Sequence, residues 1–205
     1  MNKILKNFYC IEGIDGSGKT SIIQRLQELC NNQNQLKYYF TKEPSQGVIG
    51  ELIRNQLINF KNPLRDVSLA HLYVADRYEH LYNTKSGIMK TLNLNKGKIK
   101  VITDRYLFSS IVYQGDLGYQ LNKNLPLPEK LFFIKIDPNV AYNRIQTRIQ
   151  PDLFELDLAK LKKINSRYIE VLKNFEHLID IIYLENSNEE DLEISSMKIF
   201  NLIKF

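Results

Sequence analysis

The sequence predicts an α/β fold of three layers, in which a mostly parallel sheet of five strands is covered by helices on both faces. Short apolar runs, typical of strands buried on both faces, alternate along the chain with segments of helical spacing. All five runs are followed at once by glycine or charged residues, which mark the ends of strands. The 205 residues suffice for one compact domain and are few for two, so we expect a single domain over residues 1–205.

The predicted strands are the five apolar runs themselves. They cover residues 8–12, 36–41, 99–103, 131–136 and 179–184. In open sheets of this kind, ligands bind beyond the carboxyl ends of the strands. Four polar residues follow predicted strands closely: Asp15, Glu43, Asp104 and Arg105. We therefore expect them to gather in one site at that edge of the sheet.

The helices are predicted from apolar residues that recur on one face. A first helix follows Gly18, because Ile22, Leu26 and Leu29 share a face. Further helices are predicted over residues 48–57, 67–94 with a break near Gly87, 140–148, 158–175 and 192–203. The stretch 114–130, which has two prolines near its end, is predicted to be a surface loop.

Composition and charge narrow the class of protein. Hydrophobic residues make up 43% and charged residues 25%, as in ordinary folded proteins. The net charge of +5 suits an acidic ligand such as a nucleotide, but no basic arm is present, which argues against stable nucleic-acid binding. Cys10 and Cys30 are too few for a disulfide framework, and no stretch approaches the ~20 apolar residues of a membrane span. We expect a cytoplasmic protein without membrane contact.

The strongest motif is a phosphate-binding loop, or P-loop, between the first strand and the first helix. Its pattern is Gly13, four residues, then Gly18, Lys19 and Thr20. Glycines let backbone N–H groups turn inward around an anion, and the helix that follows adds its positive N-terminal end. Lys19 is expected to reach the β- and γ-phosphates, and Thr20 to offer its hydroxyl to Mg²⁺.

The nucleotide is expected to contact one continuous stretch of the chain. Its residues are Gly13, Ile14, Asp15, Gly16, Ser17, Gly18, Lys19, Thr20 and Ser21. The motif indicates nucleotide binding and leaves the reaction open, because GTPases, ATPases and kinases all share it.

Segments spread over nearly the whole chain resemble the bacterial thymidylate kinases, which transfer a phosphoryl group from ATP to dTMP. They are Glu12–Thr20, Thr41–Pro44, Leu72–Arg77, Asp104–Tyr106 and Ser109–Gly115. The resemblance implies the nucleoside-monophosphate kinase fold with a five-stranded parallel sheet. It also implies ATP as phosphoryl donor, Mg²⁺ as cofactor, dTMP as acceptor and a homodimer built through helices.

The resemblance also implies residues that hold the acceptor's phosphate and base. Arg105 looks like the arginine that grips the dTMP phosphate, a task that suits a planar, permanently charged group, and Arg54 like a second phosphate-binding arginine. Tyr73 stands where the family stacks an aromatic ring on thymine, and Arg77 where an arginine bonds the base. From the residues alone, Arg54 also fits a solvated helix position, and Tyr73 also fits core packing.

Further resemblances complete this set. Ser110 and Gln114 match polar residues around the thymine edge, and Tyr113 matches the tyrosine that crowds the sugar 2′ position. Asp15 matches an acid near the sugar 3′-hydroxyl and magnesium. The full substrate-binding set is Asp15, Glu43, Arg54, Tyr73, Arg77, Arg105, Ser109, Ser110, Tyr113 and Gln114.

Asp104 has two readings. It follows a strand as a Walker-B-like acid does, so a magnesium contact through water is expected. A helix N-cap is the alternative.

The sequence departs from the family pattern in the lid, expected at about residues 148–156. Family members with an uncharged residue at Gly16 supply an arginine from the lid, within a run like Asp-Arg-Phe-Glu. Here Leu153 takes that arginine's place. We expect Arg148 to substitute for it, with Arg144 as the alternative. The implied catalytic set is Asp15, Lys19, Arg105, Arg144 and Arg148.

Two other functions compete with a dTMP kinase. One is a related P-loop kinase for a deoxynucleoside or another monophosphate, and the other is a nucleotide-binding protein with impaired catalysis, which Leu153 favours. The three histidines have no partner motif, and we expect them to be ordinary surface or core residues.

Overall fold

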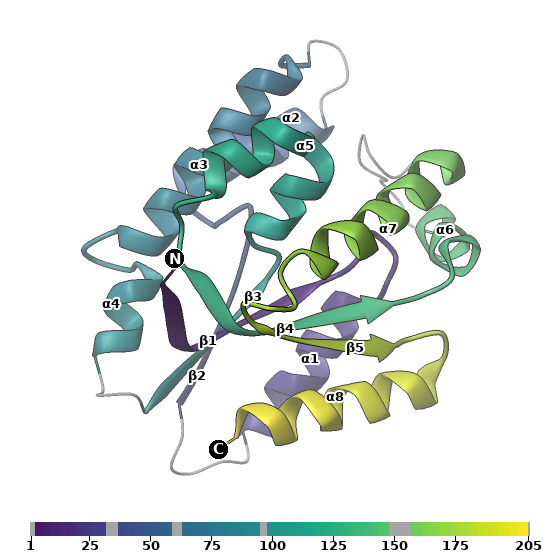
Figure 1. Cartoon of the computed structure of the whole chain (residues 1–205). Coiled ribbons are helices and arrows are strands. Elements are labelled where there is room, and N and C mark those ends of the chain that lie inside the picture. Colours follow the sequence, from purple (N-terminus) through teal and green to yellow (C-terminus); the bar gives the residue numbers. More distant parts are fainter. Residues whose placement is uncertain (1–2, 32–36, 59–62, 95–97, 148–156, 205) are drawn as a thin grey trace.

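The computed structural model describes residues 3–31, 37–58, 63–94, 98–147 and 157–204. Five parallel strands form one sheet in the order β2-β3-β1-β4-β5 (Figure 1). Their bounds are Ile4–Glu12 for β1, Lys37–Lys42 for β2, Ile99–Asp104 for β3, Leu127–Lys135 for β4 and Asp180–Glu185 for β5. The predicted five-stranded parallel sheet is therefore confirmed.

Eight helices lie within the described residues. They are α1 (Lys19–Asn31), α2 (Val48–Ile58), α3 (Asp66–Tyr82), α4 (Ile88–Asn93), α5 (Leu107–Asn122), α6 (Pro138–Gln146), α7 (Leu158–Lys173) and α8 (Glu189–Ile203). The break expected near Gly87 is present, since α3 ends at Tyr82 and α4 begins at Ile88.

Two apolar clusters, one on each face of the sheet, make three layers. Successive side chains of a strand point to opposite faces, and β1 shows this directly. Phe8 and Cys10 belong to the cluster that α3 to α7 cover, while Tyr9 and Ile11 belong to the cluster under α1 and α8 (Figure 1). Because β1 is central and buried on both sides, its C-terminal end is a rigid support for the P-loop.

The predicted surface loop over residues 114–130 is wrong. Helix α5 continues to Asn122 and strand β4 begins at Leu127. Gly115 has a φ of 61°, so the helix kinks there and then resumes, which sequence periodicity does not reveal. Pro128 is tolerated in a strand because β5 pairs with β4 only from Lys130 onward, so residues 127–129 pair with β1 alone.

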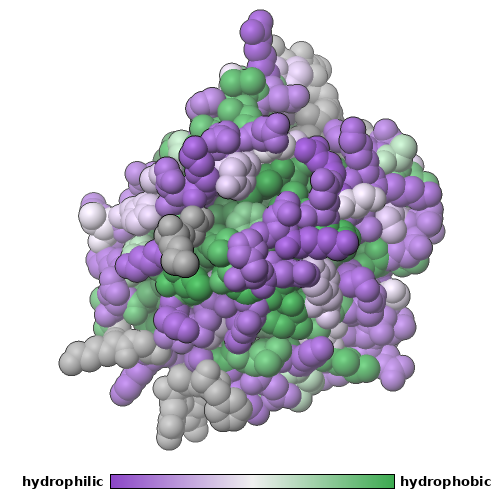
Figure 2. All heavy atoms as spheres, in the orientation of Figure 1, coloured by the Kyte–Doolittle hydropathy of each residue, from purple (hydrophilic) through white to green (hydrophobic). Residues whose placement is uncertain are grey.

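None of the described helices is long and apolar enough to cross a membrane. On the face of the molecule shown in Figure 2, hydrophilic side chains cover much of the surface and hydrophobic ones appear between them. Cys10 and Cys30 are both buried as free thiols.

Candidate functional site

The P-loop joins β1 to α1 at the carboxyl end of the sheet. Two of its glycines are required by their surroundings, not only by their backbone angles. Gly16 has a φ of 76°, and a Cβ there would lie 2.4 Å from the Ala141 carbonyl oxygen of α6. Gly18 has a φ of 86°, and a Cβ there would lie 2.1 Å from Nδ2 of Asn186. A charged side chain at Gly16 is thus excluded by the packing of α6.

Lys19 is the cation of the P-loop. Its Nζ donates to the carbonyl oxygens of Gly13 (3.0 Å) and Ile14 (2.9 Å). Burial and, to a lesser extent, the nearby positive charge of Arg105 lower the pKa of Lys19 to about 8. Two neighbouring cations, one of which lowers the pKa of the other, mark a place that an anionic group would stabilise.

Arg105 is the second cation, and it lines a pocket beside the P-loop. Its Nη2 donates to Asp15 in an ion pair, and its Nη1 donates to Oγ of Ser109 (3.0 Å) and Oη of Tyr168 (3.1 Å). Tyr113 Oη donates to the other Asp15 oxygen at 2.8 Å. Burial and the charge of Asp15 raise the pKa of the Tyr113 hydroxyl, which stays protonated as a donor.

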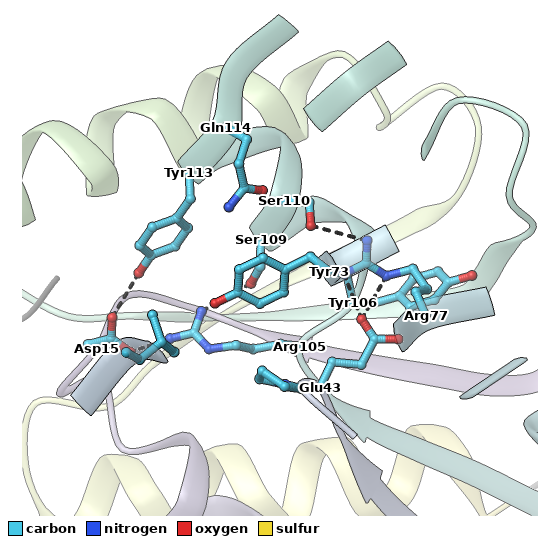
Figure 3. A pocket seen from close by; sticks show the side chains of 12 residues that line it. Asp15, Glu43, Tyr73, Arg77, Arg105, Tyr106, Ser109, Ser110, Tyr113 and Gln114 are labelled. Carbon is cyan, nitrogen blue, oxygen red and sulfur yellow. Dashed lines mark hydrogen bonds and ion pairs between the residues drawn. The ribbon is translucent and has the colours of Figure 1, made fainter. Parts of the chain in front are cut away.

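The pocket runs from these residues toward α3, and its cavity volume is about 110 Å³ (Figure 3). Twelve residues line it: Asp15, Glu43, Pro44, Leu57, Tyr73, Arg77, Arg105, Tyr106, Ser109, Ser110, Tyr113 and Gln114. We call the part around Asp15, Arg105, Ser109 and Tyr113 the P-loop end, and the part around Glu43, Arg77 and Ser110 the far end.

The far end is built on a buried ion pair. Arg77 and Glu43 are fully buried, with Nη2 of the arginine 2.6 Å from Oε2 of the carboxylate. Arg77 Nε also donates to Glu43, Nη1 donates to Ser110 (3.1 Å) and Asn122 (2.5 Å), and Nη2 donates to the carbonyl of Tyr106 (3.2 Å). All five N–H groups of this guanidinium therefore have acceptors in the protein.

Unlike Arg77, Gln114 has a side-chain polar atom without a hydrogen-bond partner among the described residues. It points into the pocket between the two ends, from α5 (Figure 3). Its Oε1 is buried and accepts no hydrogen bond from any described residue. A buried polar atom without a partner is rare in proteins, so this acceptor is available to a ligand. Tyr73 projects its ring into the same space (Figure 3).

Nine of the ten predicted substrate-binding residues line this pocket, and Arg54 does not. Arg54 Nη1 donates to the carbonyl oxygens of Pro44 (3.0 Å) and Ser45, so in this structure it braces the loop that carries Glu43. The predicted site left out five residues at or beside the pocket: Glu12, Pro44, Leu57, Tyr106 and Tyr168. Glu12 and Tyr168 reach it only through tertiary contacts, and no motif signals their role.

Thr20 and Asp104 lie together at a second cleft between α1 and the ends of β2 and β3. Asp104 Oδ1 is buried and has no hydrogen-bond partner among the described residues. The alternative of an N-cap is wrong, since α5 begins after Tyr106 and Asp104 does not cap it. A threonine hydroxyl and an unpartnered carboxylate oxygen are hard ligands of the kind that Mg²⁺ prefers.

Of the two lid candidates, only Arg144 is described. Its guanidinium donates to the carbonyl oxygens of Asn186 (3.0 Å) and Ser187 (2.9 Å), beside the P-loop at Gly18. Arg148 and Leu153 lie outside the described residues, as does the expected lid.

The histidines do not form a metal site. No group of three metal-binding side chains occurs in the part of the chain that the structure describes. His80 nevertheless contacts the site, since its ring joins Thr41 Oγ1 (2.6 Å) to Glu43 Oε1 (3.2 Å).

These features define the class of protein. A parallel sheet whose central strand ends in a glycine-rich loop with a buried lysine, next to a pocket with an arginine at its mouth, is the architecture of a P-loop nucleotide-binding protein of the nucleoside-monophosphate kinase type.

Comparison with known proteins gives the family. A profile of the thymidylate kinase family matches residues 11–194, so the chain belongs to that family. A putative thymidylate kinase of Treponema pallidum (strain Nichols) is 34% identical over 208 residues, covering 98% of this chain and 96% of the relative. A probable thymidylate kinase of Methanocaldococcus jannaschii is 31% identical over 178 residues, covering 84% and 85%. The similarity thus extends beyond bacterial proteins.

The fold matches a solved structure described as thymidylate kinase from Candida albicans. The TM-score is 0.73, with 97% of this chain and 91% of the other covered, and the sequences are 22% identical. That likeness is one of fold, and it agrees with the sheet predicted from the apolar runs.

Proposed function

We propose that the protein transfers the γ-phosphoryl group of ATP to dTMP to give dTDP, a step in dTTP synthesis. The observation that carries this function is that one pocket has a cationic end and, in its interior, a hydrogen-bond acceptor. Its P-loop end presents a guanidinium next to Lys19, and its interior presents an unpartnered acceptor on Gln114. A nucleoside monophosphate has a phosphate for the first and a base for the second.

Hydrogen-bond polarity favours a base with an N–H donor, which thymine shares with uracil, over cytosine. Thymine carries a donor at N3–H, which suits the free Oε1 of Gln114, whereas cytosine has an acceptor at N3. Tyr73 supplies a ring for stacking, worth about 1–3 kcal/mol per base. Arg77 acts mainly by holding the far end, because its N–H groups are already used.

The phosphate and the sugar of dTMP bind at the P-loop end of the pocket. Arg105 grips the dTMP phosphate, and Asp15 with its Tyr113 partner faces the sugar. Pockets for ligands of this size usually measure about 300–1,000 Å³, so we expect this pocket of about 110 Å³ to widen when dTMP enters.

Catalysis then rests on positioning and charge neutralisation. A phosphate oxygen of dTMP attacks the γ-phosphorus of ATP in line, without a covalent enzyme intermediate. Lys19, Arg105 and an arginine of the lid region share the charge that develops. We keep Arg148 in that last role, and Arg144 as the alternative beside the P-loop.

Mg²⁺ fits the residues present. Thr20 and the unpartnered oxygen of Asp104 would hold it, directly or through water, and the ion would neutralise phosphate charge.

The experiment is a coupled ADP-release assay with ATP and Mg²⁺ over dTMP, dUMP, dCMP, AMP and thymidine. We expect the highest kcat/KM with dTMP. A preference for thymidine would overturn the proposal in favour of a nucleoside kinase. ATP binding without turnover of any acceptor would overturn it in favour of a sensor.

We also propose a homodimer, formed through α2 and α3. Large apolar side chains are exposed on these helices: Val48, Leu52, Val67, Tyr78 and Tyr82. On α3 they recur at helical spacing, so they share one face. Light scattering should give twice the chain mass for the native protein, and Tyr78→Glu should shift it toward the single chain. The cytoplasmic location stays a prediction.

A further inference from the structure

Two hydroxyl groups link Arg105 to the buried carboxylate of Glu12. Glu12, the last residue of β1, is fully buried. Its Oε2 accepts hydrogen bonds from Oγ of Ser109 (2.8 Å) and from Oη of Tyr168 (3.0 Å). Those same two oxygens accept from Nη1 of Arg105. Glu12 thus lies one hydroxyl away from the guanidinium, by two parallel routes.

The protons in this network can be placed. A hydroxyl has one proton to donate, and an ionised carboxylate accepts only. Ser109 Oγ and Tyr168 Oη also lie 2.9 Å apart, but each has Glu12 as an acceptor that cannot donate in return. With both protons directed to Glu12, both hydroxyls turn lone pairs toward Arg105. The carboxylate therefore orients two acceptors of this guanidinium, which also donates to Asp15 and to the Gly13 carbonyl.

The other oxygen of Glu12 is anchored on the backbone. Oε1 accepts from the N–H groups of Tyr106 (2.9 Å) and Ser109 (3.2 Å), at the N-terminus of α5. Burial raises the pKa of Glu12, and the charge of Arg105 together with these donors opposes that rise. The carboxylate has a fixed position from which to act.

The backbone of Arg105 shows that the residue is held against its preference. Its φ of 67° lies in the left-handed region, which is unfavourable for a non-glycine residue and persists only where the surroundings determine it. The Arg105 N–H donates to the Ile11 carbonyl (2.9 Å), and Thr103 Oγ1 donates to the Arg105 carbonyl (2.9 Å).

From this geometry we infer that Glu12 and Tyr168 are positioning residues. Glu12 acts through the hydroxyls of Ser109 and Tyr168, and these hydroxyls aim the guanidinium of Arg105 at the phosphate of the acceptor. Tyr168 belongs to α7, far along the chain from the motifs that carry the site. The inference rests on the proposed function, because it assigns Arg105 a phosphate to bind.

Tyr168→Phe is the central variant, since it removes only the hydroxyl. The ring packs on Phe133 with centroids 5.3 Å apart, and phenylalanine preserves that contact. Hydrogen bonds to charged groups are strong enough that losing one costs on the order of tenfold or more in an equilibrium constant. We expect the KM for dTMP to rise about tenfold and kcat to fall, with the dissociation constants of ATP and of thymidine unchanged.

Tyr183→Phe is the matched control. Tyr183 also packs on Phe133 and donates to a carboxylate, that of Glu176, but it has no link to Arg105. It should match the wild type in every measurement. Glu12→Gln should reproduce the loss of dTMP affinity, because the amide presents donors to hydroxyls that must also accept from Arg105.

A double-mutant cycle separates positioning from fold maintenance. In an Arg105→Ala background, Tyr168→Phe should change dTMP binding less than twofold, because its target is gone. Additive losses would overturn the inference, as would an equal loss of dTMP and thymidine binding or a wild-type KM in Tyr168→Phe. If the wild type fails to phosphorylate dTMP, the proposed function fails, while the comparison of dTMP with thymidine binding still tests the network.

Discussion

The two ends of the pocket each hold an arginine, and the surroundings of the two arginines differ. At the P-loop end, Arg105 keeps 18% of its side chain exposed and sits close enough to Lys19 to lower the pKa of that lysine. At the far end, Arg77 keeps 1% exposed, and every N–H group has a protein acceptor.

The difference indicates two roles: Arg105 recognises a charged group of the ligand, and Arg77 maintains the shape of the pocket. Arg105 is partly exposed and has Lys19 near it as well as Asp15, so an anion can approach two cations at once. Arg77 is neutralised by Glu43, and removing either partner leaves the other as a buried charge. The P-loop end is therefore suited to bind and react, and the far end to fix the walls within which the base is read.

The largest expected effect is at the P-loop end. Arg105→Ala should lower kcat/KM for dTMP about a hundredfold to a thousandfold, because a preorganised charge is lost where negative charge develops. Steady-state kinetics measure this, and Tm should fall less than for the same substitution at the far end, because the Asp15 that loses its partner is only partly buried. A fall of less than tenfold would remove Arg105 from the phosphate site.

At the far end the same substitution should act on stability first. Arg77→Ala leaves Glu43 buried without its partner, which typically costs about 3–5 kcal/mol, or a fall in Tm of about 6–20 °C for a chain of this size. Calorimetry measures it. Arg25→Ala, which removes a surface ion pair with Glu28 and Glu193, is the control and should leave Tm nearly unchanged. If Arg77→Ala kept its Tm and lost only activity, the comparison would be wrong.

Gln114 tests how the base is read between the two ends. Gln114→Leu should lower kcat/KM for dTMP about tenfold to a hundredfold, since a donor on thymine would lose its buried acceptor. The activity with dCMP should change less, because cytosine has no N3–H. Gln120→Leu, at an exposed position of the same helix, is the control. Equal losses with both substrates would argue against this contact.

The smallest expected effect near neutral pH is the pH dependence that Lys19 gives to ATP binding. Its charged form binds phosphate, and its pKa of about 8 in the free protein should rise when an anion binds. ATP affinity should hold steady below pH 8 and fall by up to about tenfold per unit above it. Titration calorimetry from pH 7 to pH 10 measures this, and Lys19→Arg should abolish the slope. A flat profile for the wild type would contradict the lowered pKa.

Much of the site was predictable because strand ends are readable. Asp15, Glu43, Asp104 and Arg105 follow apolar runs, and the order of elements then places them at one edge. The predicted loop over residues 114–130 was wrong for a local reason. Gly115 at the kink and Pro128 in the part of β4 that β5 does not pair are residue types common in loops.

The sequence by itself determined the fold class, the P-loop and the approximate position of the pocket. The fold class follows from hydrophobic periodicity, the P-loop from glycine spacing, and the pocket from residues near each other along the chain. Only the tertiary structure decided which polar groups of the site already have hydrogen-bond partners within the protein. It gives every donor of Arg77 an acceptor and leaves the side-chain oxygen of Gln114 and one oxygen of Asp104 without a partner among the described residues. It also brings Glu12 of β1 to Tyr168 of α7 across 156 residues. Hydrogen-bond saturation is a property of three-dimensional neighbours, and no pattern along a single chain records it.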